Sequence, residues 1–163
     1  MKLTEIKTTY LKGFKTRVEN NIVVADVTTE NLIETVSVLH GVHHLPLLTI
    51  KATDQRKKSG GFVLYYIFGI SKSSYTLALE LKLKKERFPS LVSILFEAAL
   101  YEQEIKTFFG LIPEGNPYAN QLILHENWPD DLYPLRKDFP WNKKVPMSQG
   151  QPYVFQQISG EGI

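Results

Sequence analysis

The chain has 163 residues, of which 43% are hydrophobic and 22% are charged. This length suits one domain with a substantial core and is too short for two domains of ordinary size. The formal net charge is only +2 and cysteine is absent, so we expect no nucleic-acid partner, and disulfides and thiolate-held metal centres are excluded in this chain.

The N-terminal third predicts a strand followed by a helix. The β-branched run IVVADV at Ile22–Val27 suits a buried strand, and Thr28 or Thr29 could cap a helix after it. We expect this helix at about Glu30–His40, with Gly41 as its left-handed C-terminal cap. Its apolar residues recur at helical spacing: Leu32, Ile33, Val36 and Leu39.

Three further strands are predicted in the middle of the chain. Pro46–Thr53 and Gly61–Ile70 are rich in β-forming residues and flank a polar segment that ends in two glycines, which is typical of a hairpin. In Tyr75–Leu83 apolar and polar residues alternate with the period of a strand. We interpret these segments as an antiparallel meander.

A long helix is predicted next, from Leu91 to Phe109, because apolar residues recur at three- and four-residue intervals. Pro89 and Ser90 mark its start and Gly110 its end. Beyond it prolines indicate loops, with one short extended piece at Gln121–Leu124.

The predicted fold is α+β, an antiparallel sheet of about four strands packed with about three helices and followed by a loop-rich C-terminal extension. We expect one domain over residues 1–139. Residues 140–163 have no stable period and are interpreted as an extended tail or linker.

Membrane and secretion signals are weak in this sequence. No apolar run approaches the roughly 20 residues that a bilayer-spanning helix needs, and the first twelve residues, MKLTEIKTTYLK, lack the apolar core of a secretory signal. We therefore expect a cytoplasmic chain.

Three glutamates of the long helix are candidates for chemistry: Glu97, Glu102 and Glu104. Paired carboxylates on one helical face can serve acid/base catalysis or bind a metal. Carboxylate metal sites in helices usually add a histidine at a short helical offset, and none accompanies these residues. A salt-bridged interface is the preferred interpretation, so we assign no catalytic and no metal-binding residue.

Arg136 and Lys137 are the cationic partners expected for these glutamates. They lie with Asp138 in a turn bounded by proline, where a guanidinium and an ammonium could pin the loop to the helix. We therefore expect this loop and the helix to be in contact.

Other polar clusters have simpler interpretations. His40, His43 and His44 resemble a metal cluster, but Gly41 places them across a helix end, where histidines interact with the last carbonyls. His125 is interpreted as structural. No phosphate-binding glycine motif is present.

A basic run follows the third meander strand at Lys82, Lys84, Lys85 and Arg87. It could bind nucleic acid. A solvated strand edge is preferred, because lysines at an edge discourage unwanted strand pairing.

Aromatic residues crowd the last third of the chain, more than its loops could bury. A large protein–protein contact explains them best, and core packing of a loop-rich lobe is the alternative. They are Tyr101, Phe108, Phe109, Tyr118, Trp128, Tyr133, Phe139 and Trp141.

An ordered set of motifs in this region resembles the signature of the 30 kDa subunit family of respiratory complex I, which also occurs in membrane-bound energy-converting hydrogenases. The matching pieces are Pro89-Ser90, Tyr101-Glu102-Gln103-Glu104-Ile105, Phe108-Phe109-Gly110-Leu111, Asn116-Pro117, Gln121-Leu122-Ile123-Leu124 and Pro134-Leu135-Arg136-Lys137-Asp138-Phe139. About fifty residues are similar. Gln103, Thr107 and Gln121 depart from the charged residues usual in the family.

The segment from Asn127 to Tyr133, with Trp128 and Pro129, is more similar to the hydrogenase-type members, such as hydrogenase-4 and formate hydrogenlyase. The end of the chain, Gly160 to Ile163, resembles the point where fused members enter their catalytic domain. The resemblance thus leaves open a separate subunit or an N-terminal domain of a longer protein.

The resemblance implies a non-catalytic subunit or domain of the hydrophilic arm, peripheral to the inner face of the cell membrane, which docks the large subunit beside the iron–sulfur subunits. Partner subunits would hold the NAD and quinone sites, or the nickel–iron centre, and the iron–sulfur clusters. Two alternatives from the residues remain. One is an acid/base enzyme using Glu97, Glu104 and His125, and the other is a small RNA-binding domain.

Overall fold

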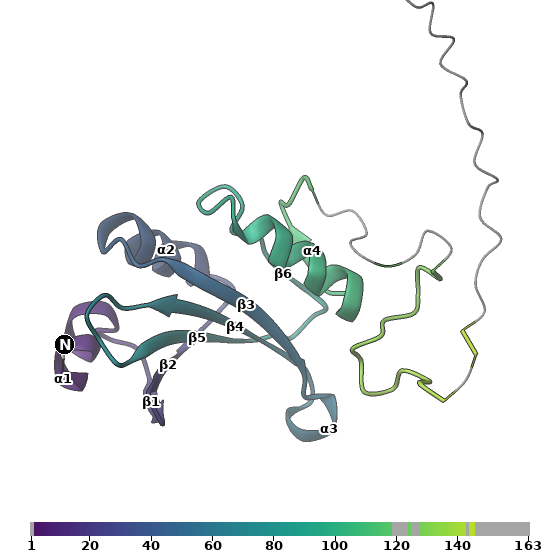
Figure 1. Ribbon diagram of the computed structural model, residues 1–163, viewed down its shortest axis with the longest axis horizontal. Helices are drawn as coiled ribbons and strands as arrows, with labels where there is room; N and C mark the ends of the chain where they lie inside the picture. Colours follow the sequence, from purple (N-terminus) through teal and green to yellow (C-terminus); the bar gives the residue numbers. More distant parts are fainter. Residues whose placement is uncertain (1, 119–123, 125–127, 143, 146–163) are drawn as a thin grey trace, which may run out of the picture.

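A five-stranded sheet forms the centre of the molecule (Figure 1). The computed structural model describes residues 2–118, 124, 128–142 and 144–145. In chain order their elements are α1 (Leu3–Tyr10), β1 (Thr16–Glu19), β2 (Ile22–Val27), α2 (Leu32–Ser37), the π-helical turn η1 (Val38–Val42), β3 (Leu47–Asp54), α3 (Arg56–Ser59), β4 (Phe62–Gly69), β5 (Thr76–Lys82), β6 (Arg87–Pro89), α4 (Ala98–Phe109) and β7 (Ile112–Glu114).

The strand order in the sheet is β1-β2-β5-β4-β3. The predicted meander is confirmed, because β3 pairs with β4 and β4 with β5, both antiparallel. The sheet is not wholly antiparallel, however, since β2 and β5 run parallel. The fifth strand, β1, was missed. It forms a hairpin with β2 through Asn20, whose positive φ of 53° suits a tight hairpin turn.

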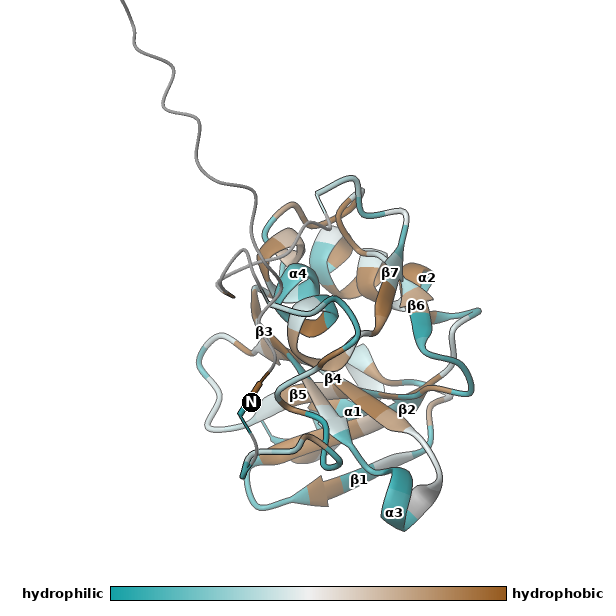
Figure 2. Ribbon diagram, turned by 90° about the vertical axis from the view of Figure 1, so that its right-hand side faces the viewer, coloured by the Kyte–Doolittle hydropathy of each residue, from teal (hydrophilic) through white to brown (hydrophobic). Residues whose placement is uncertain are grey.

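One face of the sheet carries the core. Alternate residues of β4 point to this face and pair in register with leucines of β5, so their side chains form one apolar layer. The helices α2 and α4 cover this layer (Figure 1). The members from β4 are Phe62, Leu64, Tyr66 and Phe68, all at most 3% exposed. Figure 2 shows the apolar residues concentrated in the strands, whereas α3 is hydrophilic.

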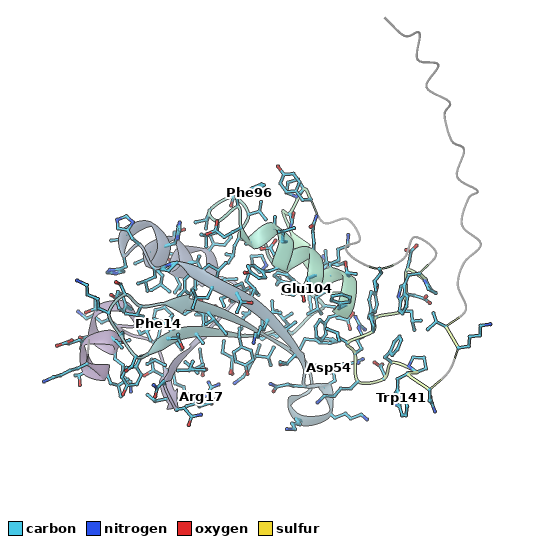
Figure 3. The ribbon with its side chains drawn as sticks, viewed as in Figure 1. Phe14, Arg17, Asp54, Phe96, Glu104 and Trp141 are labelled. Carbon is cyan, nitrogen blue, oxygen red and sulfur yellow. The ribbon has the colours of Figure 1, made fainter. Side chains whose placement is uncertain are left out.

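The opposite face of the sheet carries a network of charges around Arg17. Its guanidinium donates to Glu19 at 2.6 Å, to Asp26 at 3.2 Å and to Glu80. Lys82 lies 3.1 Å from Glu80 as well. In Figure 3 the side chain of Arg17 points away from the side of the sheet on which Phe96 lies.

The structure corrects the boundaries of the first predicted helix. α2 begins at Leu32, with Asn31 as the residue before it. The side chain of Asn31 does not cap the helix and instead accepts from the backbone N–H of Thr28, in the turn before α2, at 2.8 Å. Gly41 is not the C-terminal cap, since it lies inside η1. The left-handed residue after the helix is His44, with φ of 54°.

The predicted start of the long helix was also wrong, because α4 begins only at Ala98. Pro89 belongs to β6, which pairs parallel with β7 in a small second sheet. The backbone N–H of Leu91 donates to the carboxylate of Glu102 at 2.7 Å, and that of Val92 donates to the hydroxyl of Ser90. These bonds hold the segment before α4 in turns despite its helical spacing.

The basic run does not lie at a strand edge as predicted, because β5 is an inner strand between β2 and β4. Lys82 ends β5, and the next three basic residues lie in the connection to β6 or at the start of β6. No helix in the described part of the chain is long and apolar enough to cross a membrane.

Candidate functional site

The loop Tyr133–Phe139 lies against the C-terminal end of α4, so the two halves of the sequence signature meet in space (Figure 1). The backbone N–H of Leu135 donates to the carbonyl of Phe108 at 3.1 Å. Gly110 follows the helix in the left-handed conformation, with φ of 69°. A Cβ atom at Gly110 would lie 2.4 Å from the ring of Tyr133, so only glycine allows this close approach.

Arg136 fastens this loop. Its Nε donates to the carbonyl of Phe109 at 2.6 Å, and its two terminal nitrogens donate to Glu86 at 3.2 and 2.8 Å. The guanidinium also lies over the rings of Phe62 and Tyr133, at 5.1 and 4.4 Å from their centroids. This side chain is only 14% exposed.

The prediction that Arg136 pairs with glutamates of the helix was therefore wrong, because its partners are other groups. The guanidinium binds a carbonyl at the end of α4, where the last turn leaves carbonyls without helical partners and the helix dipole favours a cation. Its carboxylate partner is Glu86, from the connection between β5 and β6.

A second contact holds the same loop to the end of β3. The carboxylate of Asp54 accepts from the backbone N–H of Lys137 at 2.9 Å and from the guanidinium of Arg56 at 3.0 and 2.7 Å. Arg56 also donates to Asp138, at 3.2 and 2.6 Å. Lys137 thus acts through its backbone, and Figure 3 shows Asp54 beside the loop.

Asp54 is 5% exposed, and the hydrogen bonds from Arg56 hold the pKa of its carboxyl well below the usual range. Arg56 lies 5.0 Å from the ring centroid of Phe62. Sequence reasoning missed Asp54 and Arg56. We call the assembly of Asp54, Arg56, Phe62, Glu86 and the loop Tyr133–Phe139 the C-terminal clasp.

Glu102 is the buried member of the three glutamates and is 0% exposed. Its carboxylate accepts from the hydroxyl of Ser90 at 2.7 Å, from the N–H of Leu91 at 2.7 Å and from the amide of Asn116 at 2.9 Å. Burial raises the pKa of Glu102, and these three donors oppose that rise. The carboxylate joins α4 to the segments that carry β6 and β7.

Glu97 and Glu104 are both exposed and lie apart from each other. Glu97 precedes the helix as its capping residue, and Glu104 lines a shallow groove of about 310 Å³ between α4 and β3. No group of three potential metal-binding side chains occurs among the described residues. The pair does not form a compact acid/base site.

The histidines lie apart from the clasp. Nδ1 of His40 is 3.3 Å from the carbonyl of Leu45, which lies beyond the end of η1 and is not one of the last helix carbonyls that were expected as partners. His43 contacts the ring of Tyr10 edge to face. His125 lies outside the described residues, as do Gln121, Leu122 and Ile123 of the predicted extended piece.

Several aromatic residues of the signature support the loop. Trp128 donates from its indole nitrogen to the carbonyl of Leu132 at 2.6 Å and stacks on Phe139 with 6.1 Å between ring centroids. Pro134 is half-buried. Pro117 is exposed in the turn after β7, and Trp141 is 85% exposed.

An exposed apolar surface lies at the other end of α4. Phe96 and Leu100 are 68% and 63% exposed, and Leu48 and Tyr118 are each 48% exposed. Phe96 contacts the ring of Tyr118 edge to face, at 5.7 Å. Tyr101 ties this end of the helix to β3 by donating to the carbonyl of Leu48 at 3.0 Å. We call Leu48, Phe96, Leu100 and Tyr118 the apolar patch.

Fold and site together define an α+β domain in which a C-terminal loop is clasped to the last helix. The chain belongs to the family described as the respiratory-chain NADH dehydrogenase 30 kDa subunit, whose model matches residues 25–145. The resemblance seen in the motifs is thereby confirmed.

Two relatives come from Escherichia coli strain K12. Formate hydrogenlyase subunit 5 is 34% identical over 120 residues, which cover 71% of this chain. Hydrogenase-4 component G is 32% identical over 66% of the chain. The NADH-quinone oxidoreductase C/D protein of Buchnera aphidicola is 39% identical, over 47% of the chain. The matches span only 21%, 20% and 13% of these relatives.

Two solved structures share the fold. A trypsin-resistant fragment of Nqo5 superposes with a TM-score of 0.58 at 16% identity, covering 70% of this chain and 96% of the fragment. A chain of an archaeal membrane-bound sulfane sulfur reductase superposes with a TM-score of 0.69 at 23% identity, covering 83% and 82% of the two chains.

Proposed function

We propose that this chain is the 30 kDa-type subunit or domain in the hydrophilic arm of a membrane-bound energy-converting complex, where it docks the large catalytic component. In this proposal it carries no redox centre. Partner subunits hold the nickel–iron or quinone site and the iron–sulfur clusters, and the chain lies at the inner face of the cell membrane only through them. Membership of the family supports this function.

A hydrogenase-type complex is favoured over an NADH dehydrogenase. The two hydrogenase-type relatives align with 71% and 66% of the chain, whereas the C/D protein of Buchnera aligns with 47%. The segment around Trp128 and Pro129 also resembles the hydrogenase-type members in sequence. The second candidate is the corresponding arm of an NADH:quinone oxidoreductase.

The apolar patch is the observation that carries the docking role. Large apolar side chains that are at least about half exposed rarely cluster on a protein surface unless a partner covers them. Aromatic residues are common anchors of interfaces. The ring pair of Phe96 and Tyr118 and the hydrogen bond from Tyr101 to Leu48 keep the patch in one arrangement. A pre-organised surface binds a partner with a smaller entropic cost.

Affinity purification from the native membranes tests the proposal. A tagged chain should co-purify with a large subunit of the hydrogenase or NADH dehydrogenase type, identified by mass spectrometry. The variant Phe96→Asp/Leu100→Asp should lose this partner, because two carboxylates would have to be desolvated in an apolar contact.

The matched control is Val18→Asp/Ile22→Asp, which places the same charges on apolar residues that are 38% and 37% exposed, on the two strands farthest from β3. It should keep the large subunit. Equal recovery of this subunit with both double variants would refute docking through the patch. A metal or flavin bound at full stoichiometry to the purified chain alone would refute the absence of a redox centre.

A further inference from the structure

One cavity shares none of its lining residues with the clasp or the apolar patch. It has a volume of about 660 Å³. Its walls come from the residues that follow β2, from those that follow β5, and from β6 and β7. β2 and β5 are parallel neighbours, with Val27 opposite Leu81. The segments that follow these two strands therefore leave the sheet at the same end of the strands. A crevice opens where they diverge, and this is a common place for ligands in sheets with parallel strands.

The walls of this cavity are mainly basic. Four cationic side chains line it and only two acidic ones do, so positive charge is in excess. The cations are Lys82, Lys84, Lys85 and Arg87, and the acids are Glu30 and Glu114.

Two of the cations already have carboxylate partners. Arg87 donates to Glu114 at 2.9 Å, and Lys82 lies 3.1 Å from Glu80 on the outer face of the sheet. No carboxylate of the described residues lies within 4.0 Å of the ammonium groups of Lys84 and Lys85. These two adjacent lysines are therefore available to an incoming anion.

The acidic groups do not cancel this positive charge. The carboxylate of Glu30 accepts hydrogen bonds from the side chains of Thr28 and Thr29, which lower its pKa, and the charge of Lys84 lowers it further. The carboxylate of Glu30 is thus hydrogen-bonded to neighbouring residues of its own loop. Thr28 and Thr29 line the cavity as well, with their hydroxyl hydrogens directed to Glu30.

The volume and the charges together limit the chemistry of the ligand. A water molecule occupies about 30 Å³ in the liquid, so the cavity exceeds the size of a bare phosphate many times. It falls within the range of small-molecule sites, which run from about 300 to 1,000 Å³. Lysine ammonium groups bind phosphates as compact point charges.

We propose that this cavity binds a small organic phosphate with two or more negative charges, of the size of a nucleoside diphosphate. Lys84 and Lys85 contact the phosphate groups. The organic part of the ligand occupies the space toward Phe88 and Pro89. This site is independent of the docking function.

Titration of the 163-residue chain with ADP and with pyrophosphate, followed by amide NMR shifts, tests the proposal. ADP should give saturable shifts at residues 28–30 and 82–89, and should bind at least several times more tightly than pyrophosphate. Equal affinity for the two probes would refute an organic ligand. Shifts that do not saturate, or that spread over lysines throughout the surface, would show only non-specific ion binding and would overturn the site.

Two charge-matched double variants complete the test. Lys84→Gln/Lys85→Gln should weaken ADP binding at least tenfold. Lys57→Gln/Lys58→Gln, which removes an adjacent exposed pair on α3, should change it less than twofold. Similar losses in both variants would contradict a specific role for Lys84 and Lys85. Amide spectra of the unliganded variants would show that both remain folded.

Discussion

Glu102 is a fully buried carboxylate that is held by three uncharged donors rather than by a cation. Its position in the signature was recognisable from the sequence. Its burial was not, because helical spacing alone gave no reason to separate it from Glu97 and Glu104. Ser90 and Asn116 meet it only through the fold, from segments 12 and 14 residues away.

The burial of Glu102 predicts a pH dependence of stability. Because its pKa is raised above 4.5 in the folded state, the native chain binds this proton more tightly than the unfolded chain does. The contribution of Glu102 to the free energy of unfolding therefore decreases as the pH rises from about 4.5 through the raised pKa. The decrease is about 1.4 kcal/mol for each unit of pKa shift.

Urea unfolding of the wild type and of Glu102→Gln between pH 4.5 and 8 measures this effect. The glutamine variant lacks the titration, so the stability of the wild type relative to the variant should fall as the pH rises. Asp54, with its lowered pKa, stabilises the fold above pH 3.8 and loses this contribution only at lower pH. Parallel pH profiles for the two proteins would contradict the assignment.

The elements that could be predicted from the sequence are those with an unbroken period. β2 was predicted with its observed bounds, and the three meander strands were predicted within one or two residues. α1, β1, α3, β6 and β7 were missed. The last two have three residues each and pair across 22 intervening residues, so no local pattern marks them.

The C-terminal clasp was predicted in part. Contact between the loop and α4 was expected from the signature, and the structure brings them together. The partners differ, because Glu86 and Asp54 come from segments whose approach to the loop depends on the strand order. Reasoning from charge alone predicts that Arg136 pairs with the glutamates of the helix. It overlooks the carbonyl groups at the helix end, which lack helical partners.

Arg136→Ala should destabilise the fold by about 2–3 kcal/mol, since it removes a hydrogen bond to a helix-end carbonyl, a two-pronged ion pair and ring contacts together. Arg136→Lys should recover only part of this loss, because an ammonium group cannot form the bidentate pair that a guanidinium forms with a carboxylate. Urea unfolding gives both values. Arg87→Ala is the control, because it removes an exposed pair that contributes less than about 1 kcal/mol. Equal effects of Arg136→Ala and Arg87→Ala would show that the clasp contributes little.

Gly110→Ala should cost about 2–4 kcal/mol, because the left-handed backbone and the ring of Tyr133 both oppose a Cβ atom. Gly13→Ala is the matched control. Gly13 also has a positive φ, of 88°, but no atom lies within 4 Å of its added Cβ, so only about 1–2 kcal/mol is expected there. The difference between the two variants reports the steric contact and is measured by thermal or urea unfolding.

That contact can be separated from other effects of the substitution. Tyr133→Ala should be less costly in the Gly110→Ala background than in the wild type, because the alanine then removes a clash. Additive effects of the two substitutions would contradict the close packing of the loop on the helix end.

At the scale of the whole molecule, the structure separates three surfaces. The clasp closes the fold at the C-terminal end of α4, the apolar patch lies at the other end of this helix, and the basic cavity lies where β2 and β5 diverge. The sequence indicated an aromatic interface somewhere in the last third of the chain. It could not locate the patch, because Leu48 comes from β3 and joins Phe96 and Tyr118 only through the packing of α4 on the sheet.

Docking through the apolar patch is the central claim, and hydroxyl-radical footprinting tests it most directly. Oxidation of Phe96, Leu100 and Tyr118 is measured in the isolated chain and in the purified complex. We predict strong protection of these three side chains in the complex, while Val18 and Ile22 keep their reactivity. Unchanged oxidation of the patch in a complex that contains the large subunit would contradict the account.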